Sequence, residues 1–181
     1  MYPSITMKKS ILYGLISTTA ALSGLTQADD ARKPATEQAE VDVASTLEGK
    51  LQILDGDKYT PAKVNPEVSY YVVYYTASWW PPCRASVSQL VKSYNEKIAP
   101  LKNVELVMMS YDKSSNDALA WAKKESFPWP TVLGEDKAKV HFGSVKILTV
   151  PTYILFNKEG TVITKGKEKI FAEIAKMKET K

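Results

Sequence analysis

The chain has 181 residues and a formal net charge of +4, and 44% of its residues are hydrophobic, 10% aromatic and 24% charged. This composition excludes a wholly disordered chain and fits one folded domain of ordinary size. A single cysteine excludes an internal disulfide and a dithiol couple within the chain. With only one histidine as well, the sequence argues against a metal centre or a Ser/His/Asp triad. We therefore expect no metal and no cofactor.

The first 28 residues are typical of a secretory signal peptide. Lys8 and Lys9 precede a mostly apolar run at residues 11–22, and Thr26-Gln27-Ala28 supplies the small residues of a cleavage site. The run is shorter than the roughly 20 apolar residues that span a bilayer. The pattern predicts an exported protein, periplasmic or secreted, that keeps no membrane span after cleavage. The alternative is a buried N-terminal helix.

Removal of residues 1–28 would take away Lys8 and Lys9 and lower the formal charge to +2. The lysines near the C-terminus are interleaved with glutamates, which is typical of a solvated helix face. We therefore expect no binding to nucleic acid. Residues 29–46 are polar and predict a linker, and residues 47–181 are expected to form the folded domain.

The remaining chain alternates between strand and helix patterns. Residues 70–75 are a continuous run of aromatic and β-branched residues, which is typical of a strand covered on both faces. Residues 82–98 carry one apolar stripe at helical spacing, after prolines that suit a first helical turn. The other expected elements are strands at 51–54 (closed by a turn at 55–57), 104–109, 152–156 and 161–164, a helix at 116–125 capped by Ser115 or Asn116, and a final helix whose stripe is Ile170, Phe171, Ile174 and Met177.

This order places a strand–helix–strand unit before a hairpin and a closing helix. Such an order predicts the α/β class, with one central sheet between layers of helices.

Residues 77–84 join the central strand to the long helix and contain the only cysteine. A thiol in the first turn of a helix lies near the positive end of the helix dipole, which favours the thiolate form. The segment therefore has the setting of a reactive thiol site.

The sequence Tyr-Tyr-Thr-Ala-Ser-Trp-Trp-Pro-Pro-Cys-Arg at residues 74–84 resembles the redox loop of the thioredoxin superfamily, and it is most similar to tryparedoxins and nucleoredoxins. Val150-Pro151-Thr152 resembles the cis-proline loop of that family. Ser110-Tyr111-Asp112 and Phe127-Pro128-Trp129-Pro130 are similar to the tryparedoxin segment after the second core strand. The resemblance implies a thioredoxin-like fold, a central mixed β-sheet flanked by helices, and thiol–disulfide oxidoreductase ancestry.

The match fails at one position, because Trp80 stands where the resemblance expects the attacking cysteine. Cys83 matches the second, resolving cysteine. It lies four residues before Val87, on the apolar stripe of the helix, so we expect it to be buried. A buried thiol behaves as a small hydrophobe, and exchange requires a thiolate that can reach its target.

Three interpretations of this site stay open. Cys83 is a buried structural thiol, or it forms mixed disulfides on its own with a partner or a small thiol. In the third, residue 80 is a sequencing error or a recent mutation that hides an intact Cys-Pro-Pro-Cys site, since Trp and Cys codons differ by one base.

The tryptophans suggest a binding surface. The candidate residues are Trp79, Trp80, Pro81, Pro82, Val150 and Pro151. Together they predict an apolar patch for an extended peptide, with the backbone of Val150 pairing in β fashion as the resemblance implies. The alternative is that Trp80 folds back and blocks the groove. We expect protein or peptide partners, some of them thiol-containing, for a module without dithiol activity; the other function class is an oxidoreductase that acts through Cys83.

Two further residues are expected to have no functional role. Tyr74 matches a position where many thioredoxins keep a buried acid, and we expect it to be a core residue. His141 is expected at the surface or at a helix end.

Overall fold

The computed structural model describes residues 41–143 and 145–179. These residues belong to one compact unit that spans residues 37–181. The predicted signal peptide and the first part of the predicted linker, residues 29–40, lie outside the described residues.

The predicted helices and strands occur in the predicted order, together with four short elements that were not predicted. In chain order, the elements are α1 (Val43–Leu47), β1 (Leu51–Asp55), β2 (Lys58–Pro61), β3 (Tyr70–Thr76), α2 (Pro81–Lys97), β4 (Val104–Ser110), α3 (Ser115–Glu125), β5 (Thr131–Val132), the 3₁₀ helix η1 (Lys137–Lys139), β6 (Thr152–Asn157), β7 (Val162–Lys165) and α4 (Lys167–Glu179).

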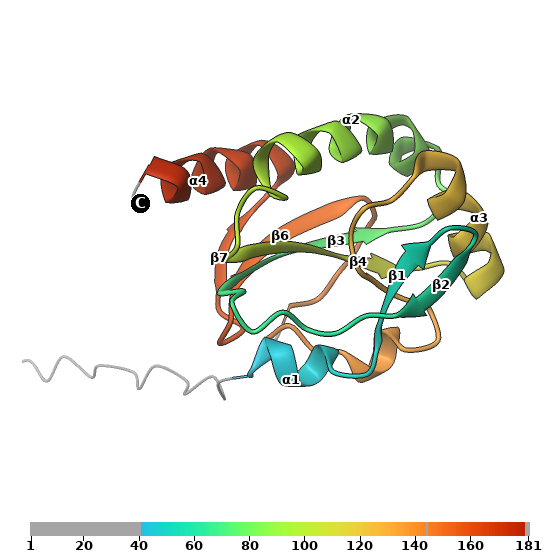
Figure 1. Cartoon of the computed structure of the whole chain (residues 1–181), viewed down its shortest axis with the longest axis horizontal. Helices are drawn as coiled ribbons and strands as arrows, with labels where there is room; N and C mark the ends of the chain where they lie inside the picture. The colour runs from blue at the N-terminus through green and yellow to red at the C-terminus, as the bar shows by residue number, and fades with distance from the viewer. Residues whose placement is uncertain (1–40, 144, 180–181) are drawn as a thin grey trace, which may run out of the picture. The chain divides into compact units, whose positions relative to one another are not determined.

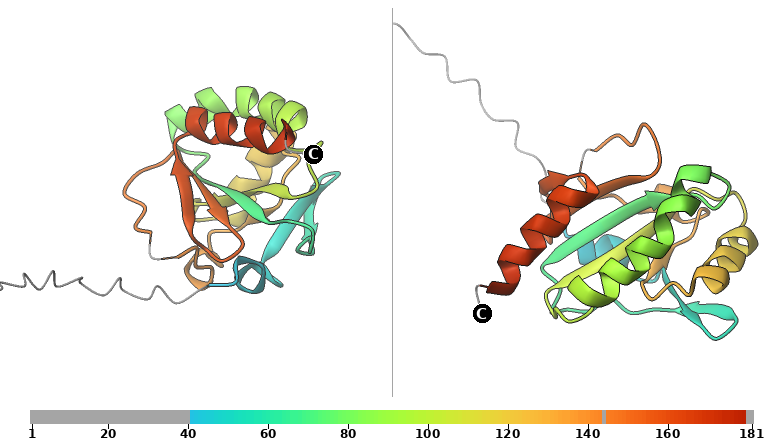
Figure 2. Two further views of the ribbon diagram at one scale, coloured as in Figure 1. Left: turned by 90° about the vertical axis from the view of Figure 1, so that its left-hand side faces the viewer. Right: turned by 90° about the horizontal axis from the view of Figure 1, so that it is seen from above.

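The strands form one mixed sheet in the order β2-β1-β5-β4-β3-β6-β7. β3 pairs in parallel with β4, and β4 in parallel with β5. The remaining pairs are antiparallel. Helices α2 and α4 lie side by side on one face of the sheet, and α1 lies on the other (Figures 1 and 2). The α/β class and the central mixed sheet flanked by helices are thus confirmed.

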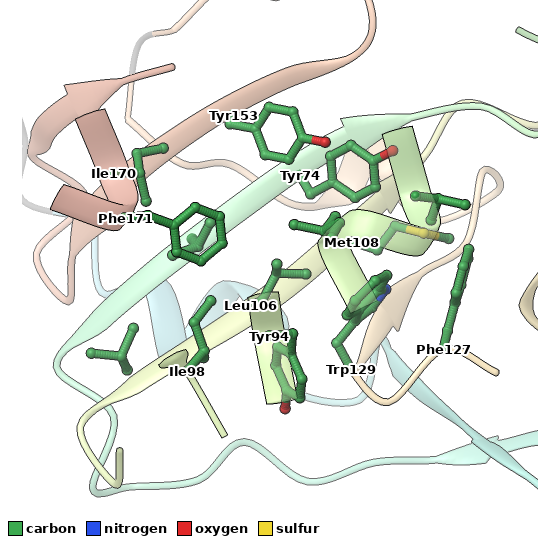
Figure 3. Packing of buried hydrophobic residues seen from close by; sticks show 14 of the residues in the cluster. Tyr74, Tyr94, Ile98, Leu106, Met108, Phe127, Trp129, Tyr153, Ile170 and Phe171 are labelled. Atoms are coloured by element: carbon green, nitrogen blue, oxygen red, sulfur yellow. The ribbon is translucent and has the colours of Figure 1, made fainter. Parts of the chain in front are cut away.

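The central strands are buried on both faces, and their side chains alternate between two cores. Val72 and Tyr74 of β3 pack under α2 and α4, in the cluster shown in Figure 3. Tyr71, Val73 and Tyr75 pack in the opposite cluster, with Val43 of α1. This alternation follows from the two-residue period of a strand, and it explains why the run at 70–75 contains no polar position.

The folded domain starts before residue 47, the boundary predicted from the sequence. Val43 and Leu47 are buried, and the Val43 N–H donates to the Lys158 carbonyl at 2.9 Å. Asp42 caps α1 by accepting from the Ala44 N–H. Residues 43–46 therefore form a helix that belongs to the core rather than a free linker.

Two smaller differences concern helix starts and short strands. The cap of α3 is Ser114, whose side chain accepts from the Asn116 N–H at 3.1 Å, and not Ser115 or Asn116. Strands β2 and β5 and the 3₁₀ helix η1 were not expected. β5 and η1 have two and three residues, too few to show a periodic pattern, and β2 contains a proline, which argues against a strand. In the part of the chain that is described, no helix combines the length and apolar character needed to cross a membrane.

Candidate functional site

The candidate site lies where β3 ends and α2 begins, and we call residues 77–80 the site loop. Trp80 occupies the N-cap position of α2, and its carbonyl accepts from the N–H groups of Cys83 and Arg84 at 3.1 and 3.2 Å. Pro81 and Pro82 fill the first helical turn, where their missing N–H groups cost no helical hydrogen bond. This local sequence sets the direction of the helix and leaves both tryptophans at its exposed start.

Ser78 is held from two sides. Its N–H and its hydroxyl both donate to one carboxylate oxygen of Asp112, at 2.9 and 2.7 Å. The Arg84 guanidinium donates to the Ser78 carbonyl at 2.9 Å. Hydrogen bonds to charged groups are the stronger kind, so the backbone of the site loop is fixed between β4 and the first turns of α2.

Asp112 is itself buried and fully engaged. Its second carboxylate oxygen accepts from the Ser110 hydroxyl at 2.9 Å, and the Asp112 N–H donates back to that hydroxyl at 3.1 Å. Gly134 passes so close that a Cβ there would collide with the Asp112 carbonyl oxygen. The anchor of the site loop is therefore built into the end of β4 and its neighbouring loop.

The register of the sheet brings these groups together. β3 and β4 run in parallel, with Thr76 opposite Ser110, so the segments that follow both strands leave the same edge of the sheet. The Tyr111 N–H donates to the Thr76 carbonyl at 2.7 Å and continues the pairing by one step. Functional groups collect at this carboxyl edge of parallel strands in α/β sheets generally.

Cys83 has no accessible surface. It lies in the cluster beneath α2 together with Tyr74 and Tyr153. The two tyrosine rings stack with centroids 4.6 Å apart, and their hydroxyls point the same way (Figure 3). The expected burial of Cys83 is confirmed, and so is the core position of Tyr74.

The tyrosine hydroxyls beside Cys83 stay protonated at neutral pH. Burial raises the pKa of Tyr74 to about 12, and the neighbouring thiol adds to the effect. Burial also raises the pKa of Tyr153. The Tyr74 hydroxyl accepts a hydrogen bond from the Thr76 hydroxyl at 2.8 Å. These two hydroxyls supply no base for the thiol, whereas a carboxylate at residue 74 would.

An apolar groove of about 320 Å³ opens beside the site loop. It is lined by Trp79, Trp80, Tyr111, Ile147, Leu148, Thr149 and Val150. Trp79 and Trp80 are 56% and 40% exposed, and their rings meet edge to face at 6.0 Å. Trp80 thus forms part of the groove wall and does not fill the groove. Leu148 is 82% exposed on the Val150 side.

The other sequence-predicted site residues lie outside this groove. Pro82 and Pro151 line a separate depression of about 420 Å³, between α2 and the start of α4. Pro81 is exposed at the helix start. The Val150–Pro151 peptide bond is cis, as expected. His141 is exposed. Within residues 41–143 and 145–179 no three His, Cys, Asp or Glu side chains gather as metal ligands.

Comparison with known proteins assigns the family. The Redoxin family model matches residues 30–179, more than four fifths of the chain. The chain belongs to the redoxin family. It is similar to zebrafish (Danio rerio) nucleoredoxin, with 32% identity over 127 residues that cover 67% of this chain and 29% of the relative. It is also similar to tryparedoxin from Trypanosoma brucei brucei, with 32% identity over 97 residues that cover 50% of this chain and 63% of the relative.

Solved tryparedoxin structures share the fold of this redoxin. Native tryparedoxin I from Crithidia fasciculata aligns with a TM-score of 0.54 and 26% identity, covering 75% of this chain and 92% of that one. Tryparedoxin I from Leishmania major aligns with a TM-score of 0.53 and 28% identity, covering 72% and 90%. The protein is therefore a thioredoxin-like member of the redox family, of the tryparedoxin and nucleoredoxin type. It spans less than a third of the length of the nucleoredoxins it matches.

Sequence reasoning missed the anchor of the site loop and half of the groove. Asp112 could have been found, because it follows a strand predicted beside the one that carries the redox segment, and the ends of such strands meet. Tyr111 could have been found in the same way, because it follows the same strand. No sequence pattern indicates Ile147 and Leu148, since they lie in a loop without periodic pattern.

Proposed function

We propose that this redoxin binds extended protein or peptide segments in the apolar groove and does so without a dithiol cycle. We further propose that it works in the cell envelope, because residues 1–28 have the pattern of a secretory signal. The observation that carries the proposal is the pairing of an exposed Trp80 with a Cys83 that has no accessible surface.

The number of cysteines and their burial argue against thiol–disulfide exchange. A dithiol cycle needs two sulfurs, and the chain has one cysteine. A single-thiol exchange needs that sulfur to reach a target disulfide, and Cys83 lies on the buried side of α2, in the same core cluster as Tyr74 and Tyr153. A buried thiol packs as a small apolar side chain.

The binding part rests on the exposed apolar wall. Exposed tryptophans gathered with an exposed leucine are typical of a contact surface for protein. Among the described residues the Val150 N–H makes no backbone hydrogen bond, and the Val150 carbonyl accepts only a long one of 3.4 Å from the Thr149 hydroxyl. The backbone of Val150 can therefore pair with an incoming extended segment.

The test is insulin reduction by dithiothreitol, followed as turbidity. Wild-type protein is expected to run at the background rate. Trp80→Cys is expected to accelerate the reaction at least about tenfold, because residue 80 caps α2 at the exposed end of the site loop and a thiol there would be accessible.

Trp80→Ser is the matched control, since it removes the indole and adds no thiol. It is expected to stay at background. Wild-type turnover equal to that of Trp80→Cys would overturn the proposal, and a wild-type chain with cysteine at residue 80, found by resequencing the gene, would do the same.

The second candidate function is a thiol–disulfide oxidoreductase that acts through Cys83 alone. It is favoured by the features of the scaffold that are present: the anchored site loop, the cis peptide before Pro151 and the likeness to tryparedoxins. Labelling of native Cys83 by iodoacetamide separates the candidates. Labelling at the rate of a free thiol near pH 7 supports the enzyme, and labelling only on unfolding supports the binding module.

A further inference from the structure

We infer that the groove selects segments in which an acidic side chain lies two residues from a bulky apolar one. This inference rests on the proposed function and names the chemistry of its ligand. A cationic pocket adjoins the apolar groove, and the two together make a bipartite site.

The two cavities share a wall. The cationic pocket has a volume of about 140 Å³, and Tyr111 and Ile147 line it as well as the apolar groove. Lys137 is the charged side chain among its lining residues. A ligand that fills the apolar groove therefore has a positively charged neighbour one side chain away.

Lys137 is held in place but is not neutralised. Its ammonium lies 3.9 Å from the centroid of the Tyr111 ring, a cation–π contact that fixes it at the shared wall. Within the described part of the chain it makes no ion pair. Neither of the two preceding carboxylates pairs with it in that part: Glu135 accepts from the Ser115 hydroxyl, and Asp136 pairs with Lys139 at 2.7 Å.

An acidic side chain of the ligand would complete this arrangement. Side chains two residues apart on an extended strand point to the same side, roughly 6.5 Å from each other. One of them can enter the apolar groove between Trp80 and Leu148 while the other reaches over Tyr111 to Lys137. A neutral segment would fill only the apolar groove and leave the cationic pocket empty.

The experiment titrates four cysteine-free peptides, acetylated and amidated, into the full chain by calorimetry. One has a central leucine with aspartate two residues away on both sides, the second has serine there, the third has lysine, and the fourth keeps the aspartates but replaces the leucine by alanine. We expect the acidic leucine peptide to bind about fivefold more tightly than the serine peptide, and the lysine peptide more weakly than both. The alanine peptide should not bind.

Lys137→Gln tests the assignment directly, with Lys123→Gln on the exposed face of α3 as a control that removes the same charge away from both cavities. Lys137→Gln is expected to abolish the preference for acid, so that the acidic and serine peptides bind alike. Lys123→Gln should retain the preference. Raising the salt concentration should weaken binding of the acidic peptide alone.

The outcomes separate the two proposals. Equal binding of the acidic and serine peptides would overturn the inference and leave the proposed function standing. Failure of every leucine peptide would overturn both. A fifth peptide, the serine peptide with a free C-terminal carboxylate, completes the set; if it binds more tightly than the acidic leucine peptide, the inference of an acidic side chain is overturned.

Discussion

Two tryptophans lie at the surface, in the site loop, and two lie in the core, one on α3 and one in the segment between α3 and β5. Trp79 and Trp80 are 56% and 40% exposed, whereas Trp121 and Trp129 are 5% and 0% exposed. The core pair is surrounded by aromatic rings: Trp129 stacks on Phe127 at 4.9 Å and meets Tyr74 and Tyr94 edge to face. In the surface pair the two rings contact each other edge to face, and both line the apolar groove.

One residue type thus serves stability in the core and is available for recognition at the surface. Burying apolar surface contributes roughly 25 cal/mol per Å², so an exposed indole leaves part of its possible contribution unused. In the surface pair that surface stays available to a partner. The site loop can hold the pair in this exposed position because Asp112 and Arg84 fix its backbone instead.

Trp129→Ala gives the largest expected effect. It should lower the free energy of unfolding by about 3–5 kcal/mol, because the fully buried Trp129 side chain leaves a cavity among the surrounding rings. Trp79→Ala, its surface counterpart, should change it by less than about 0.5 kcal/mol and weaken peptide binding. Urea unfolding followed by circular dichroism measures the change in stability of both variants, and calorimetry measures peptide binding.

Trp129→Phe adds a finer control. Among the described residues the Trp129 indole N–H has no hydrogen-bond partner, so the substitution by phenylalanine reduces the ring volume without breaking a hydrogen bond. Its destabilisation should be well below that of alanine. Equal losses for Trp79→Ala and Trp129→Ala would contradict the division into a surface pair and a core pair.

The sequence predicted the buried strands well, because their signal is local. The run at residues 70–75 and the stripe on α2 are complete within their own segments. Helix α1 carried no such signal, since it has five residues and includes Val43 and Thr46, which favour strands. Its stability comes from contacts distant in sequence, such as the bond from Val43 to Lys158.

The same reasoning explains the site. The motif at residues 77–84 was enough to predict a buried Cys83 and to name Trp79 and Trp80. It could not predict Leu148 as a wall of the groove, because that placement depends on how a loop far along the chain folds back onto the motif. Nor could it predict Lys137 above Tyr111, which is a tertiary contact between two segments without periodic pattern.

Asp112→Ala tests the support of the surface pair and has the second largest expected effect. It removes the acceptor of two hydrogen bonds from Ser78 and one from Ser110. The free energy of unfolding should fall by about 2–3 kcal/mol, because buried donors lose a charged partner.

The site loop should also lose its fixed backbone. In the Trp80→Cys background, Asp112→Ala is therefore expected to lower insulin reduction at a temperature where the protein remains folded. Asp136→Ala is the control, since its ion pair with Lys139 is at the surface and its loss should cost less than about 1 kcal/mol. Unchanged stability on loss of Asp112 would show that the loop is held by other contacts.

The smallest expected effect lies at the margin of the core pair, where Tyr94 links Trp129 to Glu105. The Tyr94 hydroxyl donates to the Glu105 carboxylate at 3.0 Å, and the Leu106 N–H donates to the same oxygen at 2.8 Å. Burial raises the pKa of Glu105 above the ordinary carboxyl value of 4.5, and these two hydrogen bonds only partly oppose it.

A carboxyl group with a raised pKa in the folded state binds its proton more tightly there than in the unfolded chain. Its contribution therefore favours the folded state at low pH. That contribution is lost as the pH rises from about 4.5 through the pKa of the folded protein. Glu105→Gln keeps the shape and removes the titration, so the unfolding free energy of the wild type minus that of the variant should fall over this window and then level off.

Urea unfolding at intervals between pH 4 and 7 measures this difference, and Glu96→Gln on the exposed face of α2 should leave the step in place. A wild-type advantage that instead grows with pH would mean that the Tyr94 and Leu106 hydrogen bonds outweigh burial. Trp129 would then pack against an aromatic ring held by an ionised carboxylate, and the core pair would depend on charge as much as the surface pair does.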